Sequence, residues 1–192
     1  YMLIGVIAGG TLGINAVLFY MLAYGIMNTA AFAVIAGLER RGQEIESLAD
    51  ISGLRHRHPW MATVMALSAA SLIGLPPLLG FWGKLLIFIA GVEAGQIWLV
   101  VIAGLNSAIS AWYYLGLVQQ PLLAKPSPQA ETVVAHRSVW PRVAGLITAA
   151  AVVVLPIFTQ YLFDAARTAT SRPEPPQAAA EPAPESDINH PG

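Results

Sequence analysis

The sequence contains no cysteine and few charged residues. Without cysteine, disulfides, thiolate catalysis and cysteine-held zinc or iron–sulfur centres are excluded. Charged residues make up 11% of the chain, whereas soluble domains have about 25%. The net charge is −1 and the basic residues form no stripe, so we expect no nucleic-acid partner. These shortages point to a membrane protein.

Long stretches of the chain lack Asp, Glu, Lys and Arg altogether. Residues 1–38, 94–124 and 143–163 have none, and residues 59–92 have only Lys84. A membrane-spanning helix needs about 20 apolar residues, so each stretch is long enough to cross a bilayer. Hydrophobic residues make up 56% of the chain. The sequence therefore predicts an all-α fold, a polytopic transmembrane helix bundle.

The polar segments between these stretches set the expected boundaries. The segment GGTLG with Asn15 is expected to form a turn between the first two spans. Because Tyr1 lies inside an apolar run, we expect the chain to be a piece of a longer membrane protein. The membrane unit is expected to be residues 1–166, with spans at 1–10, 15–38, 59–92, 96–119 and 139–165 and polar loops at 39–58 and 120–138. Residues 167–192 are rich in Pro and Ala, which predicts a disordered tail.

The span at residues 59–92 contains a helix break. Pro76 and Pro77 lack backbone N–H groups and clash with the preceding turn, so the helix must be interrupted at residues 75–80. The segment is either one interrupted span or two short ones. One span places seven basic residues on the side of the two polar loops against two opposite, while two spans give six against three. The positive-inside rule favours one discontinuous helix, with both loops cytoplasmic and the C-terminal tail on the opposite side.

Lys84 follows the break by about one helical turn. A lysine at the centre of a membrane helix costs about 2.5–3.5 kcal/mol, and its default interpretation is functional. Non-helical backbone at this depth is tolerated only inside protein or beside a wet cavity. We therefore predict that Pro76, Pro77 and Gly80 form a hydrated hinge, and that Lys84 carries protons near the positive end of the second half-helix. A snorkelling lysine and a purely structural proline kink are the alternatives.

Other polar and aromatic residues inside the expected spans carry weaker signals. The candidate polar contacts of an ion path are Asn28, Asn106, Ser107 and Ser110. Packing or hydrogen bonding between helices is the alternative explanation for each of them. Tyr113 and Tyr114 fit anchoring at the membrane interface. His56 and His58 would diverge on a helix, so no metal site is expected there.

Several stretches together resemble a known family. They are YMLIGV, FYMLAYGIMNTAAFAVIAGLERRG, EIESLADISGLRHRHPW, SLIGLPPLLGFWGKLLIF and LNSAISAWYYL. Each is similar to subunit N of bacterial proton-pumping NADH:quinone oxidoreductase, the respiratory complex I, whose mitochondrial counterpart is subunit 2. The GLPPLLGF motif is shared with the broader antiporter-like superfamily, whereas DISGL and NSAISAWYYL are typical of subunit N.

This resemblance implies the C-terminal portion of a membrane subunit in an enzyme that couples NADH-to-quinone electron transfer to outward proton pumping. Family members have a discontinuous helix followed by a lysine or glutamate assigned to proton transfer, which here is Lys84. No redox centre, cofactor or metal is expected in this chain, because NADH, FMN, iron–sulfur clusters and quinone belong to the assembled complex. The implied partners are the lipid bilayer of the bacterial inner membrane and other membrane subunits of complex I, notably the neighbouring antiporter-like ones.

Two departures and two rival functions accompany this resemblance. The related distal subunits carry a lysine at about the place of Asn28, and the family's other charged residues lie outside this chain. The first rival is a subunit of a multisubunit sodium/proton antiporter, which would use the same broken helix and lysine. The second is a structural membrane scaffold without an ion path, in which Lys84 pairs with a fixed carboxylate.

The predicted topology can be tested with introduced cysteines, because the chain has none of its own. In a full-length subunit without other cysteines, Lys125→Cys should react with a membrane-impermeant maleimide only in inverted vesicles. Ala180→Cys should react only in intact spheroplasts, since the positive-inside rule keeps the basic loops on the cytoplasmic side. Labelling of Lys125→Cys from the outer face would contradict the single interrupted span.

Overall fold

The structure is a bundle of α-helices. It is a computed structural model that describes residues 1–40, 45–128, 130–135, 139–159 and 161. Its helices are α1 (Met2–Ala8), α2 (Gly10–Ala36), α3 (Pro59–Ile73), α4 (Leu79–Glu93), α5 (Ile97–Leu122) and α6 (Trp140–Val154). Shorter elements are the 3₁₀ helices η1 (Leu48–Ile51), η2 (Leu54–His56), η3 (Ala130–Thr132) and η4 (Leu155–Phe158), and the strands β1 (Leu38–Arg40) and β2 (Val133–Ala135). The predicted all-α membrane bundle is confirmed, whereas the predicted tail at 167–192 lies outside the described residues.

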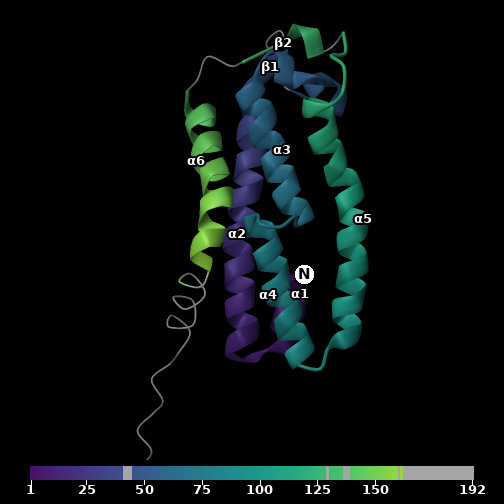
Figure 1. The fold of residues 1–192 in the computed structure, drawn as a ribbon, viewed down its shortest axis with the longest axis vertical. Coiled ribbons are helices and arrows are strands. Elements are labelled where there is room, and N and C mark those ends of the chain that lie inside the picture. Colours follow the sequence, from purple (N-terminus) through teal and green to yellow (C-terminus); the bar gives the residue numbers. More distant parts are fainter. Residues whose placement is uncertain (41–44, 129, 136–138, 160, 162–192) are drawn as a thin grey trace, which may run out of the picture.

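The helices differ in whether they are long enough to cross a membrane alone. The helices α2 and α5 and the segment Trp140–Phe158 are long and apolar enough. Helices α3 and α4 have 15 residues each, fewer than a bilayer crossing requires. Figure 1 shows them one above the other along the long axis, beside the uninterrupted α2. This end-to-end arrangement supports one interrupted crossing over two complete ones.

The connection between α1 and α2 is shorter than the sequence suggested. Gly9 and Gly10 have φ angles of 65° and 60°, a region that glycine enters without steric cost, and the chain reverses there. Asn15 is buried within α2 rather than in a turn. The predicted turn over GGTLG and Asn15 is therefore wrong, because two glycines suffice for the reversal and the rest of the segment continues as helix.

The polar loops before α3 and after α5 are joined to each other, which the sequence did not predict. Strand β1 pairs antiparallel with β2, with Leu38 opposite Ala135. Arg57 strengthens the connection, because its Nη1 donates to the carbonyl oxygens of Ala130 and Val133 at 3.0 and 3.2 Å. Both loops therefore form one cap at the end of the bundle where the labels β1 and β2 stand in Figure 1.

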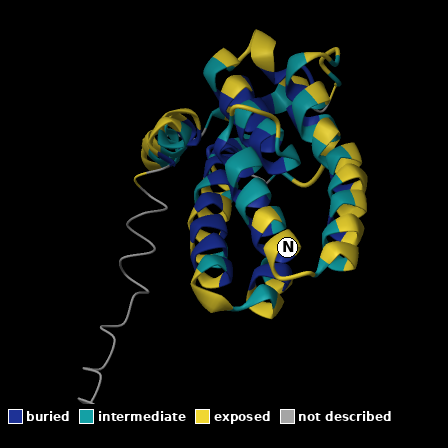
Figure 2. Ribbon diagram, turned by 60° about the horizontal axis from the view of Figure 1, so that its bottom comes forward, coloured by how far each residue is buried: buried dark blue, intermediate teal, exposed yellow. Residues whose placement is uncertain are grey.

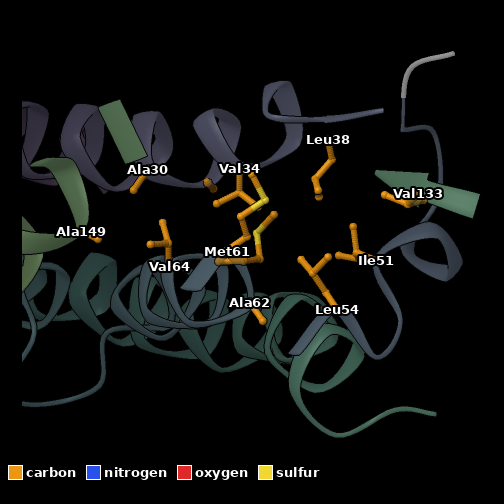
Figure 3. Close-up of a cluster of buried hydrophobic side chains, with 12 residues drawn as sticks. Ala30, Val34, Leu38, Ile51, Leu54, Met61, Ala62, Val64, Val133 and Ala149 are labelled. Atoms are coloured by element: carbon orange, nitrogen blue, oxygen red, sulfur yellow. The ribbon is translucent and has the colours of Figure 1, made fainter. Parts of the chain in front are cut away.

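The buried side chains gather in the middle of the bundle, where α2 contributes to each buried cluster. Figure 3 shows a cluster in which Val34 of α2 lies against Met61 of α3. Leu54 of the cap lies near them, and Val133 lies at the far end of the cluster, next to Ile51. Figure 2 shows burial concentrated on the central helices, while the outer helices α5 and α6 have many exposed residues. Trp112 of α5, for example, is 83% exposed. This face of α5 has the apolar character of a surface that meets lipid or another membrane protein.

The residue that precedes α3 gives a prediction about acid stability. Burial lowers the pKa of the His58 imidazole below its ordinary value of 6.5, and the nearby Arg57 and Arg142 lower it further. As the pH falls, the unfolded chain therefore takes up a proton at His58 before the folded chain does. The contribution of neutral His58 to the free energy of unfolding is fully present above about pH 6.5 and is lost as the pH falls through the lower pKa of the folded chain. His58→Gln should make the melting temperature of the purified full-length subunit less sensitive to acidification from pH 8 to pH 5.5. An unchanged acid sensitivity would show that this group does not contribute.

Candidate functional site

The interruption between α3 and α4 leaves the last carbonyl groups of α3 without partners in their own helix. Helix α3 ends at Ile73, and the next residue, Gly74, has a left-handed conformation with φ of 95° and ψ of 38°. The exposed Pro76 and Pro77, joined by a cis peptide bond, occupy the connection, and α4 begins at Leu79. Proline cannot supply the N–H groups that would continue the helix. The break therefore presents free acceptors inside the bundle.

Lys84 satisfies these acceptors. Its side chain is only 8% exposed. The Nζ atom donates to the carbonyl oxygens of Leu72 at 3.0 Å and Ile73 at 2.8 Å, and to Ser107 Oγ at 3.0 Å. An ammonium group has three N–H donors, and each has an oxygen partner here. All three partners are uncharged. Because Nζ lies inside the bundle and does not reach toward the membrane surface, the structure disfavours a snorkelling lysine.

The position of Nζ corrects one detail of the sequence analysis. We expected the positive N-terminal end of α4 to act on Lys84, but Nζ lies at the C-terminal end of α3, which is the negative end of that helix. Side chains on a helix point toward its N-terminus, so a lysine one turn into α4 reaches back across the break. The charge thus sits where the dipole of α3 stabilises it.

Close packing at Gly80 holds the two half-helices together. The Gly80 N–H donates to Ser71 Oγ at 3.0 Å, and this hydroxyl in turn donates to Met27 Sδ at 2.9 Å. Ser68 Oγ donates to the Met27 carbonyl oxygen of α2. A Cβ atom at Gly80 would overlap the Ser71 carbonyl oxygen, so only glycine allows this approach. The sequence analysis missed both serines, whose three-residue spacing places them on one face of α3.

A cavity of about 360 Å³ lies beside Lys84. Asn106, Ser110 and five tyrosines contribute to its wall: Tyr1, Tyr20, Tyr24, Tyr113 and Tyr114. Lys84 Nζ lies 5.2 Å from the centre of the Tyr1 ring, within the range of a cation–π interaction. The Tyr1 hydroxyl is buried and has no hydrogen-bond partner among the described residues. The cavity therefore offers polar groups close to the lysine.

Two of these tyrosines were expected elsewhere. From their residue type, we expected Tyr113 and Tyr114 to anchor the chain at the membrane interface. In the structure they line the cavity beside Lys84. The signal that could have identified this face is the helical spacing of Asn106, Ser110 and Tyr113, which are four and three residues apart on α5.

The candidate polar residues occupy two separate places. Ser107 contacts Lys84, Asn106 and Ser110 line the cavity, and Ser110 Oγ donates to the Ser107 carbonyl oxygen at 2.8 Å. Asn28 instead donates to the Tyr24 carbonyl oxygen of its own helix at 2.8 Å and lines a mainly apolar groove of about 730 Å³ between α2 and α6. The structure thus brings three of the four candidates to the lysine. In the described part of the chain, no group of His, Asp or Glu side chains could hold a metal ion.

Comparison with known families gives this geometry its context. The model of the NADH:quinone oxidoreductase/Mrp antiporter transmembrane family matches residues 1–110, which include the helix break, Lys84 and Ser107. The chain belongs to this family. Curated relatives in the NADH:quinone oxidoreductase/Mrp antiporter family include NADH-quinone oxidoreductase subunit N of Paramagnetospirillum magneticum, which is 43% identical over 126 residues, 66% of this chain and 26% of the relative. NADH-quinone oxidoreductase subunit N 2 of Solidesulfovibrio magneticus is 39% identical over 178 residues, 91% of this chain and 36% of the relative.

A solved structure has a similar fold. A chain of respiratory complex I from Thermus thermophilus with bound aureothin superposes with a TM-score of 0.73 at 30% identity, over 85% of this chain and 36% of that chain. These matches confirm the resemblance to subunit N that the sequence motifs indicated. The chain spans about a quarter to a third of the length of these relatives.

The contact at Gly80 can be tested by adding one methyl group. Gly80→Ala should destabilise the full-length subunit by about 1–3 kcal/mol, because the new Cβ meets backbone that cannot move without separating α3 from α4. The measurement is thermal unfolding of the purified subunit in detergent. Gly25→Ala is the matched control, since a Cβ at Gly25 of α2 meets no atom within 4 Å, and it should leave the transition almost unchanged.

Proposed function

We propose that this chain forms part of a proton-translocating membrane subunit of an NADH:quinone oxidoreductase, in which electron transfer from NADH to quinone drives protons out across the bacterial inner membrane. The family match and the names of the relatives support this function. The observation that carries it is the position of Lys84: the ammonium group is buried, bonded to uncharged oxygens at a helix break, and beside a cavity with polar groups.

Lys84 is the proton carrier in this proposal. A buried ammonium that is held by neutral acceptors can give up its proton without leaving a partner carboxylate unpaired. The neighbouring cavity supplies the hydroxyl and amide groups of Tyr1, Ser110 and Asn106, which are suitable partners for bridging water molecules. Pro76 and Pro77 keep the end of α3 open as an acceptor, and Gly80 lets α4 approach it.

The remainder of the enzyme's chemistry belongs to other parts of the complex. We assign no redox centre to this chain, so NADH, FMN, iron–sulfur clusters and quinone are bound by the assembled enzyme. The exposed apolar face of α5, with Trp98 and Trp112, is available to lipid or to a neighbouring antiporter-like subunit. The loops at 39–58 and 120–138 face the cytoplasm in this arrangement, with the C-terminal tail on the opposite side.

A second candidate function follows from the family description, which names Mrp antiporters together with NADH:quinone oxidoreductases. A subunit of a sodium/proton antiporter would use the same break and the same lysine. The two functions differ in what drives the proton. An antiporter exchanges sodium for protons without NADH, and the proposed function requires NADH oxidation.

Replacing the lysine tests the proposed function directly. In inverted membrane vesicles, Lys84→Met in the full-length subunit should lower NADH-driven proton uptake at least about tenfold, since positioned acid–base groups contribute about 10²–10⁴ in rate. Lys84→Glu should retain part of the activity, because a carboxyl group also exchanges protons. NADH oxidation and the amount of assembled complex are measured in parallel. Proton uptake by Lys84→Met equal to that of the wild type would refute the role of this lysine.

A further inference from the structure

The three acceptors around Lys84 are not chemically equivalent. The carbonyl oxygens of Leu72 and Ile73 accept hydrogen bonds and cannot donate them. The Ser107 hydroxyl also accepts from Nζ, but it carries a proton of its own and is able to donate. Among these three partners, Ser107 alone can therefore reverse the direction of its hydrogen bond.

This difference matters when the lysine loses its proton. An ammonium group has three N–H donors, which match three acceptors. The neutral amine has two N–H donors and one lone pair, so three partners that only accept would leave one oxygen and the lone pair facing each other. Two acceptors and one donor are needed instead, and a buried polar group without a partner is costly.

We propose that Ser107 is a positioning residue that keeps Lys84 fully hydrogen-bonded in both protonation states. Ser107 accepts from the ammonium and, after a rotation of its hydroxyl, donates to the lone pair of the amine. The carbonyl oxygens of Leu72 and Ile73 keep the other two N–H groups in both states. The proton that leaves is the one that Nζ had donated to Ser107. It passes to water in the cavity that Lys84 lines, so Ser107 takes no net proton. This role rests on the proposed function of Lys84.

The surroundings of Ser107 suit this role. Ser110 Oγ donates to the Ser107 carbonyl oxygen at 2.8 Å, which fixes this turn of α5. Ser107 is half-buried, whereas Ser110 is buried and lines the cavity. The Ser107 hydroxyl thus contacts the Lys84 ammonium group. The centre of the Tyr1 ring lies 5.2 Å from the same Nζ atom. The direction of a single hydrogen bond between α4 and α5 then reports whether Lys84 is protonated.

The test compares two substitutions of nearly equal shape. Ser107→Thr and Ser107→Val both add bulk, but only threonine retains the hydroxyl. In inverted vesicles that carry the assembled complex, Ser107→Thr should keep at least about half of the wild-type NADH-driven proton uptake. Ser107→Val should lower it about tenfold, the change expected from losing one hydrogen bond to a charged group. Rescue by threonine separates the hydrogen bond from the space the side chain fills.

A control and one further variant make every outcome decisive. Thr148→Val removes a hydroxyl that donates, among the described residues, only to carbonyl oxygens of its own helix α6, those of Ala144 and Gly145. Proton uptake by this variant should stay within about twofold of the wild type. If Ser107→Val does not assemble, Ser107→Ala carries the test because it adds no bulk, and the same tenfold loss is expected. Wild-type uptake in an assembled variant without the hydroxyl would overturn the proposal. Failure of both variants to assemble would also overturn it, because the hydroxyl would then be structural.

Lys84→Met, measured in the same vesicles, separates this proposal from the proposed function. If Lys84→Met pumps like the wild type, the role of the lysine fails and that of Ser107 fails with it. If Lys84→Met is impaired while Ser107→Val and Ser107→Thr behave alike, the lysine remains the carrier and only the role of Ser107 is refuted.

Discussion

The hydrogen bonds from the Lys84 ammonium group to the last carbonyl oxygens of α3 are the interaction on which the site depends. A helix that ends inside a membrane leaves carbonyl groups that cost several kcal/mol each if they find no donor. A charged lysine at the same depth is costly for the opposite reason, because it has donors and no water. The hydrogen bonds between them lower the free-energy cost of burying both groups, so the helix break and the charged lysine stabilise each other. Gly74 and Gly80 provide the space in which they meet.

This pairing also suits the proton exchange that we propose for Lys84. A lysine bound to a fixed carboxylate is tied to the ionised state by that partner, whereas one bound to carbonyl and hydroxyl oxygens is not. The dipole of α3 favours the charged state. In the function that we propose, a proton released by Lys84 passes into the nearby tyrosine-lined cavity. The chain belongs to the NADH:quinone oxidoreductase/Mrp antiporter family and spans about a quarter to a third of the length of the relatives that it matches.

The sequence predicted those features that depend on composition and on single residues. Apolar runs indicated the membrane helices, and two adjacent prolines indicated the helix break. The one lysine within these runs indicated the candidate site. It did not predict which helix end Lys84 would reach, because that depends on how α3 and α4 stack. Tyr113 and Tyr114 suit either an interface or a cavity wall, and only the neighbouring helices decide between the two. Strands of three residues are too short to show a period, so β1 and β2 were also missed.

The cap made by β1, β2 and Arg57 gives the bundle two mechanically different ends. At the capped end, side chains from one loop bond the backbone of the other, as Ser127 Oγ does to the Ala49 carbonyl oxygen at 2.7 Å. At the opposite end, α4 passes into α5 through a tight turn at Gly95. Helix α3 is anchored in the cap, and α4 is attached to it across a segment that is not helical. The two half-helices are therefore joined across the break by side-chain contacts, those of the Lys84 ammonium group and of Ser71 with Gly80, and not by continuous helix.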